Sequence, residues 1–338
     1  MLKGYTKFYY NTLEGEEKKI YRALYEGFKA RRNEIEIFTD STRYTVNDIV
    51  RIAEYVYNDT PVFYYLDTYH ASYRKMRNND GYIYQVLYIY TEEQIQKYDA
   101  QIEKGLETFK KKRIREDMTD YEKELAIHDY LVTTITYDEE GRGVKHEPYN
   151  IIGALILQKA VCWGIACAFK LLCDYCQIKS FVIIGEKYPK TSDTRHAWNV
   201  VKLDRECYHV DVTWDIKEKG SFPFRYEYLN LKDILIQIDH RWNEDFYPVC
   251  KAHKYNYYYK NNLFTRKVED IAPVVAEQLR KGVKCVTFKH STKLPDKDVI
   301  LREMEKGCRQ VYPRWTDTYY YTINENTHNI YFDISDRK

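Results

Sequence analysis

Residues 153–178 restrict the possible folds of this 338-residue chain more than any other segment. From 165 to 176 apolar residues recur at helical spacing, which predicts a mostly buried helix. Cys162 would lie at or just before the first turn of that helix. Unpaired N–H groups and the positive end of the helix dipole would favour a thiolate there and could bind an oxyanion. Cys162 is therefore a candidate nucleophile, although a lone buried cysteine is more often inert packing.

Residues 196–215 predict two strands joined by a tight turn. If Leu203 pairs with Glu206, His196 and Asp211 fall on one face of the hairpin as diagonal neighbours within side-chain reach. A carboxylate in that position can fix the imidazole tautomer and stabilise the imidazolium that nucleophilic catalysis needs. The hairpin therefore supplies a base and an orienting acid for a cysteine nucleophile.

Three separated segments of the chain resemble the transglutaminase-like superfamily. They are residues 159–166 (Lys-Ala-Val-Cys-Trp-Gly-Ile-Ala), 196–199 (His-Ala-Trp-Asn) and 208–215 (Tyr-His-Val-Asp-Val-Thr-Trp-Asp). Residues 127–131, 137–138 and 239–242 are also similar to bacterial members of that family. The resemblance implies a papain-like core, in which a helix bearing the nucleophile packs on an antiparallel sheet bearing the histidine and the aspartate.

By this resemblance Cys162 is the nucleophile, His196 the general base and acid, and Asp211 the acid that orients the histidine. The reaction would be attack of the thiolate on a peptide or glutamine-type carboxamide, giving a thioester. Hydrolysis by a protease or deamidase is favoured, because bacterial sequences of this type look more like proteases than cross-linking enzymes. A cross-linking transglutaminase and a non-catalytic interaction scaffold are the alternatives. The expected partner is a protein or peptide substrate, with no cofactor and no metal, and the oligomeric state is left open.

The chain departs from the family pattern directly beside the nucleophile. Trp163 stands where the family often has a polar residue, and Gly164 is followed by Ile165 where tyrosine is usual. Gly164 could let a substrate backbone approach closely. Trp163, Gly164 and Trp198 are the candidate residues of the substrate cleft, although core packing explains Trp198 equally well.

Other cysteines and histidines favour packing over chemistry. Four residues have spacings that could mimic a zinc site: Cys173, Cys176, Cys250 and His253. The first two fall in the middle of a predicted helix, without the turn that zinc knuckles use, so we expect no structural zinc. His209 could replace His196 as the base, but we expect both His209 and His128 to be packed in the core.

The whole chain predicts an α+β protein in three parts, an N-terminal module (1–115), the core (116–245) and a C-terminal module (246–338). Helices are predicted at 14–31, 46–58, 91–113 and 119–133, and strands at 34–38, 62–66 and 82–90. Capping boxes at Thr91 and Thr119 would open the last two helices. Four residues recur at an offset of 250: Phe38, Ser41, Thr42 and Asp48 as Phe288, Ser291, Thr292 and Asp298. The two flanking modules could therefore be related, with chance matching as the competing explanation.

Composition argues against several classes of function. Lysine and arginine total 53 against 51 for aspartate and glutamate, so the chain lacks the clustered basic excess of a nucleic-acid-binding protein. No stretch approaches eighteen uncharged apolar residues, and the N-terminus has no apolar export segment. We therefore expect no membrane partner, a cytoplasmic location and eight reduced cysteines.

Overall fold

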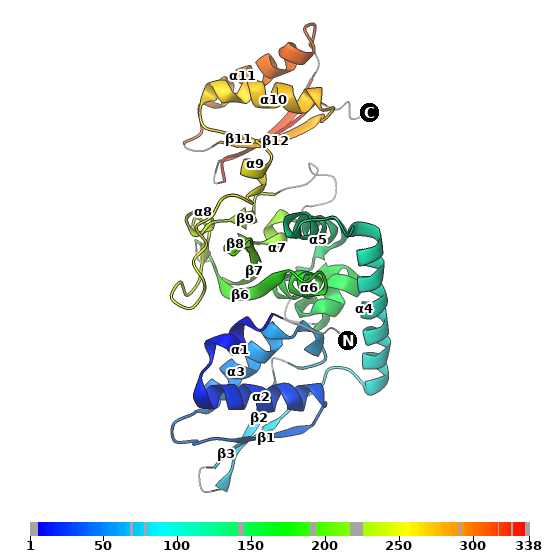
Figure 1. Cartoon of the computed structure of the whole chain (residues 1–338), viewed down its shortest axis with the longest axis vertical. Helices are drawn as coiled ribbons and strands as arrows, with labels where there is room; N and C mark the ends of the chain where they lie inside the picture. The colour runs from blue at the N-terminus through cyan, green and yellow to red at the C-terminus, as the bar shows by residue number, and fades with distance from the viewer. Residues whose placement is uncertain are drawn as a thin grey trace.

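The computed structural model describes residues 6–67, 70–77, 80–140, 145–189, 194–216, 226–290, 293–316, 318–325 and 327–334. Sheets of three, five and four strands follow one another along the long axis of the molecule, each with its own helices (Figure 1). A two-stranded sheet completes the set within the described residues. This mixture confirms the predicted α+β class. Among the described helices, none combines the length and the apolar character that crossing a membrane would require.

The N-terminal module is a three-stranded antiparallel sheet covered by two helices that pack against each other. The apolar stripe predicted on the first of these, α2, is buried. The run predicted as a strand at 62–66 is wrong: it begins as a 3-10 turn, because Pro61 starts a new helical turn and only Leu66 forms a bridge to Tyr88. The elements are α1 (Phe8–Thr12), α2 (Gly15–Lys29), β1 (Glu34–Phe38), α3 (Val46–Asp59), η1 (Pro61–Phe63), β2 (Ser72–Lys75) and β3 (Gly81–Gln85).

Helices α4 (Glu92–Arg113) and α5 (Asp120–Thr134) connect this module to the core. Both begin with the predicted capping boxes, in which Thr91 pairs with Gln94 and Thr119 with Glu122. Helix α4 runs along one side of the molecule from the N-terminal module to the core (Figure 1). The domain boundaries at 115 and 245 stay a prediction.

The core consists of a central helix, α6, packed on a five-stranded antiparallel sheet with the strand order β10-β6-β7-β8-β9. Asn199 on β7 ties the two layers together, because its Nδ2 donates to the carbonyl oxygen of Ala166 on α6 at 3.0 Å. The elements are β4 (Thr136–Tyr137), η3 (Glu147–Tyr149), η4 (Gly153–Leu157), β5 (Lys159–Ala160), α6 (Cys162–Tyr175), β6 (Lys179–Lys187), β7 (Arg195–Leu203), β8 (Glu206–Val210), α7 (Val212–Asp215), β9 (Leu229–Leu231), α8 (Asp233–Ile236) and β10 (His240–Arg241).

The hairpin of β7 and β8 has the register that the sequence predicts. Leu203 pairs with Glu206, and the ladder continues without a shift to Asn199 and Val210. Asp204 and Arg205 form the turn with positive φ, which non-glycine residues adopt at some cost. Strand β8 ends at Val210, so Asp211 stands at the strand end and opens the short helix α7.

The C-terminal module repeats the order of the N-terminal one. Its strands β12, β14 and β13 are antiparallel and ordered like β1, β3 and β2, and one extra strand, β11, pairs in parallel with β12. Helices α10 and α11 pack together as α2 and α3 do. The elements are α9 (Tyr257–Lys260), β11 (Phe264–Thr265), η5 (Val268–Asp270), α10 (Ile271–Arg280), β12 (Cys285–His290), α11 (Lys297–Val311), β13 (Tyr320–Asn324) and β14 (Asn329–Asp333).

The four-residue recurrence does not mark equivalent positions. Phe38 is 66% exposed, whereas Phe288 is fully buried. The buried residue of β1 next to it, Ile37, is the one that matches Phe288 in its environment. Ser291 and Thr292 lie outside the described residues. Shared strand order thus agrees with a relation between the modules, but that relation stays a prediction.

Candidate active site

Cys162 is the first residue of α6, as the sequence predicts. The residue before it, Val161, has no side-chain oxygen with which to cap the helix. The first N–H groups of a helix have no intrahelical partner, so the amides around Cys162 can stabilise negative charge on sulfur or on an oxyanion. The thiol is half-buried.

His196 and Asp211 meet at the end of the hairpin. Nε2 of His196 lies 2.6 Å from Oδ2 of Asp211, and both side chains are buried. Asp211 also accepts a hydrogen bond from the backbone N–H of Trp214 at 3.3 Å, which fixes the carboxylate at the start of α7. Because Nε2 of His196 contacts Asp211, Nδ1 is the ring nitrogen that can face the cysteine.

The thiol of Cys162 and the ring of His196 interact, and each changes the pKa of the other. Burial raises the pKa of the Cys162 thiol, but the hydrogen bond and charge of His196 lower it to below the ordinary value. Burial lowers the pKa of His196, but Asp211 and Cys162 together raise it well above the ordinary value. Both shifts favour a thiolate–imidazolium pair. The structure thus brings together the three residues predicted from the sequence.

A second histidine contacts the carboxylate of Asp211, and sequence reasoning assigned it no role. His240 on β10 is fully buried, with Nε2 3.0 Å from Oδ2 of Asp211 and Nδ1 2.6 Å from Oδ1 of Asp239. Asp239 in turn accepts a hydrogen bond from the hydroxyl of Tyr228. The two ring nitrogens of His240 thus face two different carboxylates. The signal available in the sequence was the family-like run 239–242.

Charge explains why Asp211 stays ionised although it is completely buried. Burial alone would raise the pKa of Asp211, but the charge of His196 and the hydrogen bonds from both histidines hold it well below the ordinary value. Two imidazoles sharing one carboxylate oxygen make Asp211 the centre of the site.

Trp198 packs in the core, which decides between the two roles that the sequence left open for it. It is 1% exposed and stacks on the ring of His196 with 5.8 Å between centroids. Its Nε1–H donates to Nδ1 of His209 at 3.0 Å, and Nε2 of His209 then donates to Asp233 at 2.9 Å. Since Trp198 can only donate, His209 is held neutral with its Nδ1 lone pair occupied. His209 is therefore a support for Trp198 and cannot act as the base.

The other two cleft candidates differ from each other. A side chain at Gly164 would collide with backbone carbonyl oxygens of Pro148 and Asn150, so the glycine allows packing within the protein and not the approach of a substrate. Trp163 is half-buried and turns toward the N-terminal module, where its Nε1–H donates to Oδ1 of Asn58 at 2.9 Å. Of the three cleft candidates, Trp163 is the one whose side chain is still partly exposed and can contact a ligand.

His128 has the structural role expected of it. Its Nε2 lies 3.0 Å from Oδ2 of Asp215, and both groups are buried. Burial lowers the pKa of His128, but the hydrogen bonds to Asp129 and Asp215 raise it above the ordinary value. Asp215 also accepts the backbone N–H groups of Glu227 and Tyr228, so this pair ties α5 to the segment before β9.

Two clusters of possible metal ligands occur among the described residues, and neither has the geometry of a metal site. In the first, His196 and Asp211 are 2.6 Å apart, whereas two ligands of a tetrahedral zinc ion are separated by roughly 3.4 Å. In the second, His209 is already bonded through both nitrogens, and the carboxylate of Asp233 accepts the backbone N–H of Cys250. Burial raises the pKa of the Cys250 thiol, which opposes the thiolate form that zinc requires.

Comparison with known proteins agrees with the core that the sequence predicts. The sequence profile of the transglutaminase-like superfamily matches residues 107–212, a range that contains Cys162, His196 and Asp211. No curated protein matches the chain. Similar solved structures include a TGase, with a TM-score of 0.32 and 18% identity over 49% of this chain and 50% of that one. The chain therefore spans about half the length of that structure.

Two further similar structures are described as candidate proteases. One is a candidate cysteine protease from Cytophaga hutchinsonii, with a TM-score of 0.28 and 13% identity over 43% of this chain and 61% of that one. The other is a candidate protease from Parabacteroides distasonis, with a TM-score of 0.27 and 12% identity over 42% of this chain and 30% of that one. Scores and identities this low carry no information on activity. On the match of residues 107–212, the chain carries a transglutaminase-like superfamily domain.

Proposed function

We propose that the protein is a cysteine-dependent hydrolase that cleaves a peptide bond or a glutamine-type carboxamide through a thioester. The observation that carries the proposal is that His196, paired with the buried Asp211, interacts with Cys162 at the first turn of a buried helix. A binding scaffold needs no histidine whose two ring nitrogens face a thiol and a buried carboxylate.

The first half of the reaction would form the thioester. The Cys162 thiolate attacks the carbonyl carbon, and the resulting oxyanion is stabilised by N–H groups at the start of α6. The tetrahedral intermediate collapses as the C–N bond breaks and His196 gives its proton to the departing nitrogen. Asp211 keeps the ring of His196 oriented throughout.

The second half would release the acyl group. His196, now neutral, takes a proton from water as the water oxygen attacks the thioester carbonyl. Breakage of the C–S bond yields a carboxylic acid and regenerates the thiolate beside the imidazolium. Transfer to an amine would follow the same steps with a different acceptor, so the acceptor alone separates a hydrolase from a cross-linking enzyme.

Intact-mass analysis after limiting iodoacetamide tests the reactive pair. We expect Cys162 to alkylate faster than the other seven thiols between about pH 5 and 8, and His196→Ala to remove this advantage. Cys207 is an internal control, because it is also half-buried while burial raises its pKa. Equal labelling of Cys162 and Cys207 would contradict the proposal.

Mass spectrometry of peptide mixtures then identifies the acceptor. Cleaved peptides or glutamate in place of glutamine would support hydrolysis, in the wild-type protein and not in Cys162→Ala. Products joined only by isopeptide bonds would show that the acceptor is an amine and that the hydrolase assignment is wrong.

A further inference from the structure

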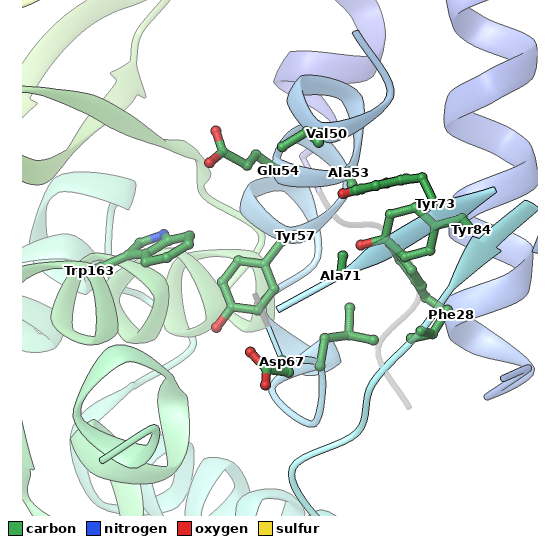
Figure 2. Close-up of a pocket in the computed structure, with 12 residues that line it drawn as sticks. Phe28, Val50, Ala53, Glu54, Tyr57, Asp67, Ala71, Tyr73, Tyr84 and Trp163 are labelled. Carbon is green, nitrogen blue, oxygen red and sulfur yellow. The ribbon is translucent and has the colours of Figure 1, made fainter. Parts of the chain in front are cut away.

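A pocket of about 250 Å³ lies where the N-terminal module meets α6. Figure 2 shows Trp163 and Tyr57 on one side of it and Phe28, Tyr73 and Tyr84 on the other. Trp163 packs edge-to-face on Tyr57 with centroids 5.0 Å apart, and Tyr73 does the same on Tyr84 at 5.1 Å. The pocket is therefore lined on two sides by aromatic rings and is large enough for one long side chain.

The pocket adjoins both reactive residues along the chain. Trp163 directly follows Cys162 at the start of α6. Glu54, which also lines the pocket, lies 3.4 Å from the guanidinium of Arg195, the residue directly before His196. The pocket therefore lies at the end of α6 that carries Cys162, in a position to take one side chain of a substrate held at the thiol.

Two carboxylates line a space whose remaining walls are aromatic or aliphatic. Glu54 and Asp67 lie at opposite margins of the pocket (Figure 2). The side chains that pair with them, Arg195 with Glu54 and His70 with Asp67, do not line the pocket and are mostly exposed. Aromatic faces attract cations, and carboxylates at the margins add to that attraction. A cationic side chain would replace the water it displaces from these carboxylates with positive charge, which a neutral or acidic side chain would not do.

We propose that this pocket binds the side chain of a lysine or arginine residue of a peptide substrate. The aliphatic stem would lie among the aromatic rings and the charged end would contact one of the two carboxylates at the margins, Glu54 or Asp67. Carboxylates hold a lysine in its protonated form, which is not a nucleophile, so this pocket selects a substrate residue and does not supply an amine acceptor. The inference deepens the proposed function, on which it rests for the identity of the ligand as part of a substrate.

Binding of a small blocked amino acid to the full-length protein tests the pocket without depending on catalysis. The ligands are N-acetyl-lysine methylamide and its uncharged analogue N-acetyl-norleucine methylamide. The indole N–H resonance of Trp163, assigned with Trp163→Phe, reports binding by NMR. We expect the lysine ligand to shift this resonance with an affinity at least about fivefold higher than that of the norleucine ligand.

Variants of the two carboxylates show whether charge is the cause. Glu54→Gln and Asp67→Asn keep size and hydrogen-bonding capacity and should remove most of the preference for lysine. Glu36→Gln, an exposed acid on the same module that does not line the pocket, should leave the preference unchanged. An unshifted Trp163 resonance, equal affinity for both ligands or an unchanged preference in the double carboxylate variant would overturn the proposal.

Catalysis is measured separately on peptides that contain lysine, arginine or norleucine at each position. If the ligand binds as expected and no peptide is cleaved, the hydrolase assignment fails and the pocket stands as a binding site. If peptides are cleaved with no preference for basic residues at any position, the pocket proposal fails and the hydrolase assignment stands.

Discussion

At the scale of single residues, His240 should tune the reactive pair through Asp211. The hydrogen bond and charge of His240 contribute to lowering the pKa of Asp211, and they should thereby reduce the effect of Asp211 on His196. His240→Gln keeps a donor near the position of Nε2 but removes the charge, so Asp211 should hold the proton of His196 more strongly. We expect the alkaline titration of His196, followed by NMR of labelled histidine, to move upward by on the order of one pH unit.

His209→Gln is the matched control for His240. His209 is equally buried in the same sheet, but it bonds to Asp233 and not to Asp211. The titration of His196 should therefore not move in this variant. Equal shifts in both variants would show a general change in the core, and no shift in His240→Gln would show that its charge does not reach His196.

The residues of the site differ in how far the sequence could predict them. His196 and Asp211 follow from the register of one hairpin, because pairing is local and the turn fixes it. His240 lies on a strand of two residues, too short for any periodic pattern to place it on the sheet. The sequence left open whether Trp198 lines the cleft or packs in the core, and the rings of His240 and Trp242, which pack on it, decide for the core.

At the scale of elements, α5 carries a buried acid that should make the stability of the core depend on pH. Burial raises the pKa of Glu124 to about 8, while Asn230 donates a hydrogen bond to Oε2. The folded protein therefore keeps a proton that the unfolded chain loses above its ordinary pKa, and the free energy of unfolding falls as pH rises from about 4.5 to 8. In Glu124→Gln this part of the decrease should vanish, a flattening on the order of 3 kcal/mol.

Urea unfolding followed by tryptophan fluorescence measures that slope. Four of the five tryptophans, at 163, 198, 214 and 242, lie between α6 and the segment after β10, so fluorescence reports mainly on the core. Glu36→Gln, at an exposed position, should keep the wild-type slope. If Glu124→Gln lost stability between pH 5 and 8 as steeply as the wild type, Glu124 would be ionised in the folded protein.

Elements with local start signals were predictable, and those set by packing were not. The capping boxes at Thr91 and Thr119 provide hydrogen-bond partners for N–H groups at the starts of α4 and α5, using residues three positions apart. A local sequence pattern is therefore enough to predict where both helices begin. The run 62–66 has the composition of a strand, yet the turn at Pro61 and burial among the helices decide its structure.

At the scale of the whole molecule, the N-terminal and C-terminal modules are joined to the core in different ways. The N-terminal module shares one continuous apolar cluster with the core, whereas the C-terminal module has a separate cluster of its own. Polar contacts should therefore contribute more to holding the C-terminal module on the core than to holding the N-terminal one. Their centre is Glu227, which is 2% exposed and accepts hydrogen bonds from the hydroxyl of Tyr331 and from Nδ2 of Asn324.

The order of the modules could be read from helix and strand patterns, but this joint could not. Glu227 and Tyr331 are 104 positions apart, and neither belongs to a recognisable motif. The pKa of Lys289, on β12, also depends on contacts that form only in the folded protein. Burial lowers this pKa to about 8, although the negative charges of Glu227, Asp215 and Asp239 act to raise it.

Glu227→Gln should loosen the C-terminal module without disturbing the active site. The change removes the charge that Tyr331, Asn324 and the buried Lys289 all face, and a lost charge-assisted hydrogen bond costs about 1.5–3 kcal/mol. Limited proteolysis near α9, between the core and the module, should therefore accelerate about tenfold or more, while alkylation of Cys162 stays unchanged.

Glu305→Gln is the matched control, because Glu305 accepts a hydrogen bond from the hydroxyl of Tyr319 at 2.9 Å entirely within the C-terminal module. Acceleration by both variants would place the weakness inside the module, and acceleration by neither would mean that apolar contacts alone hold the joint.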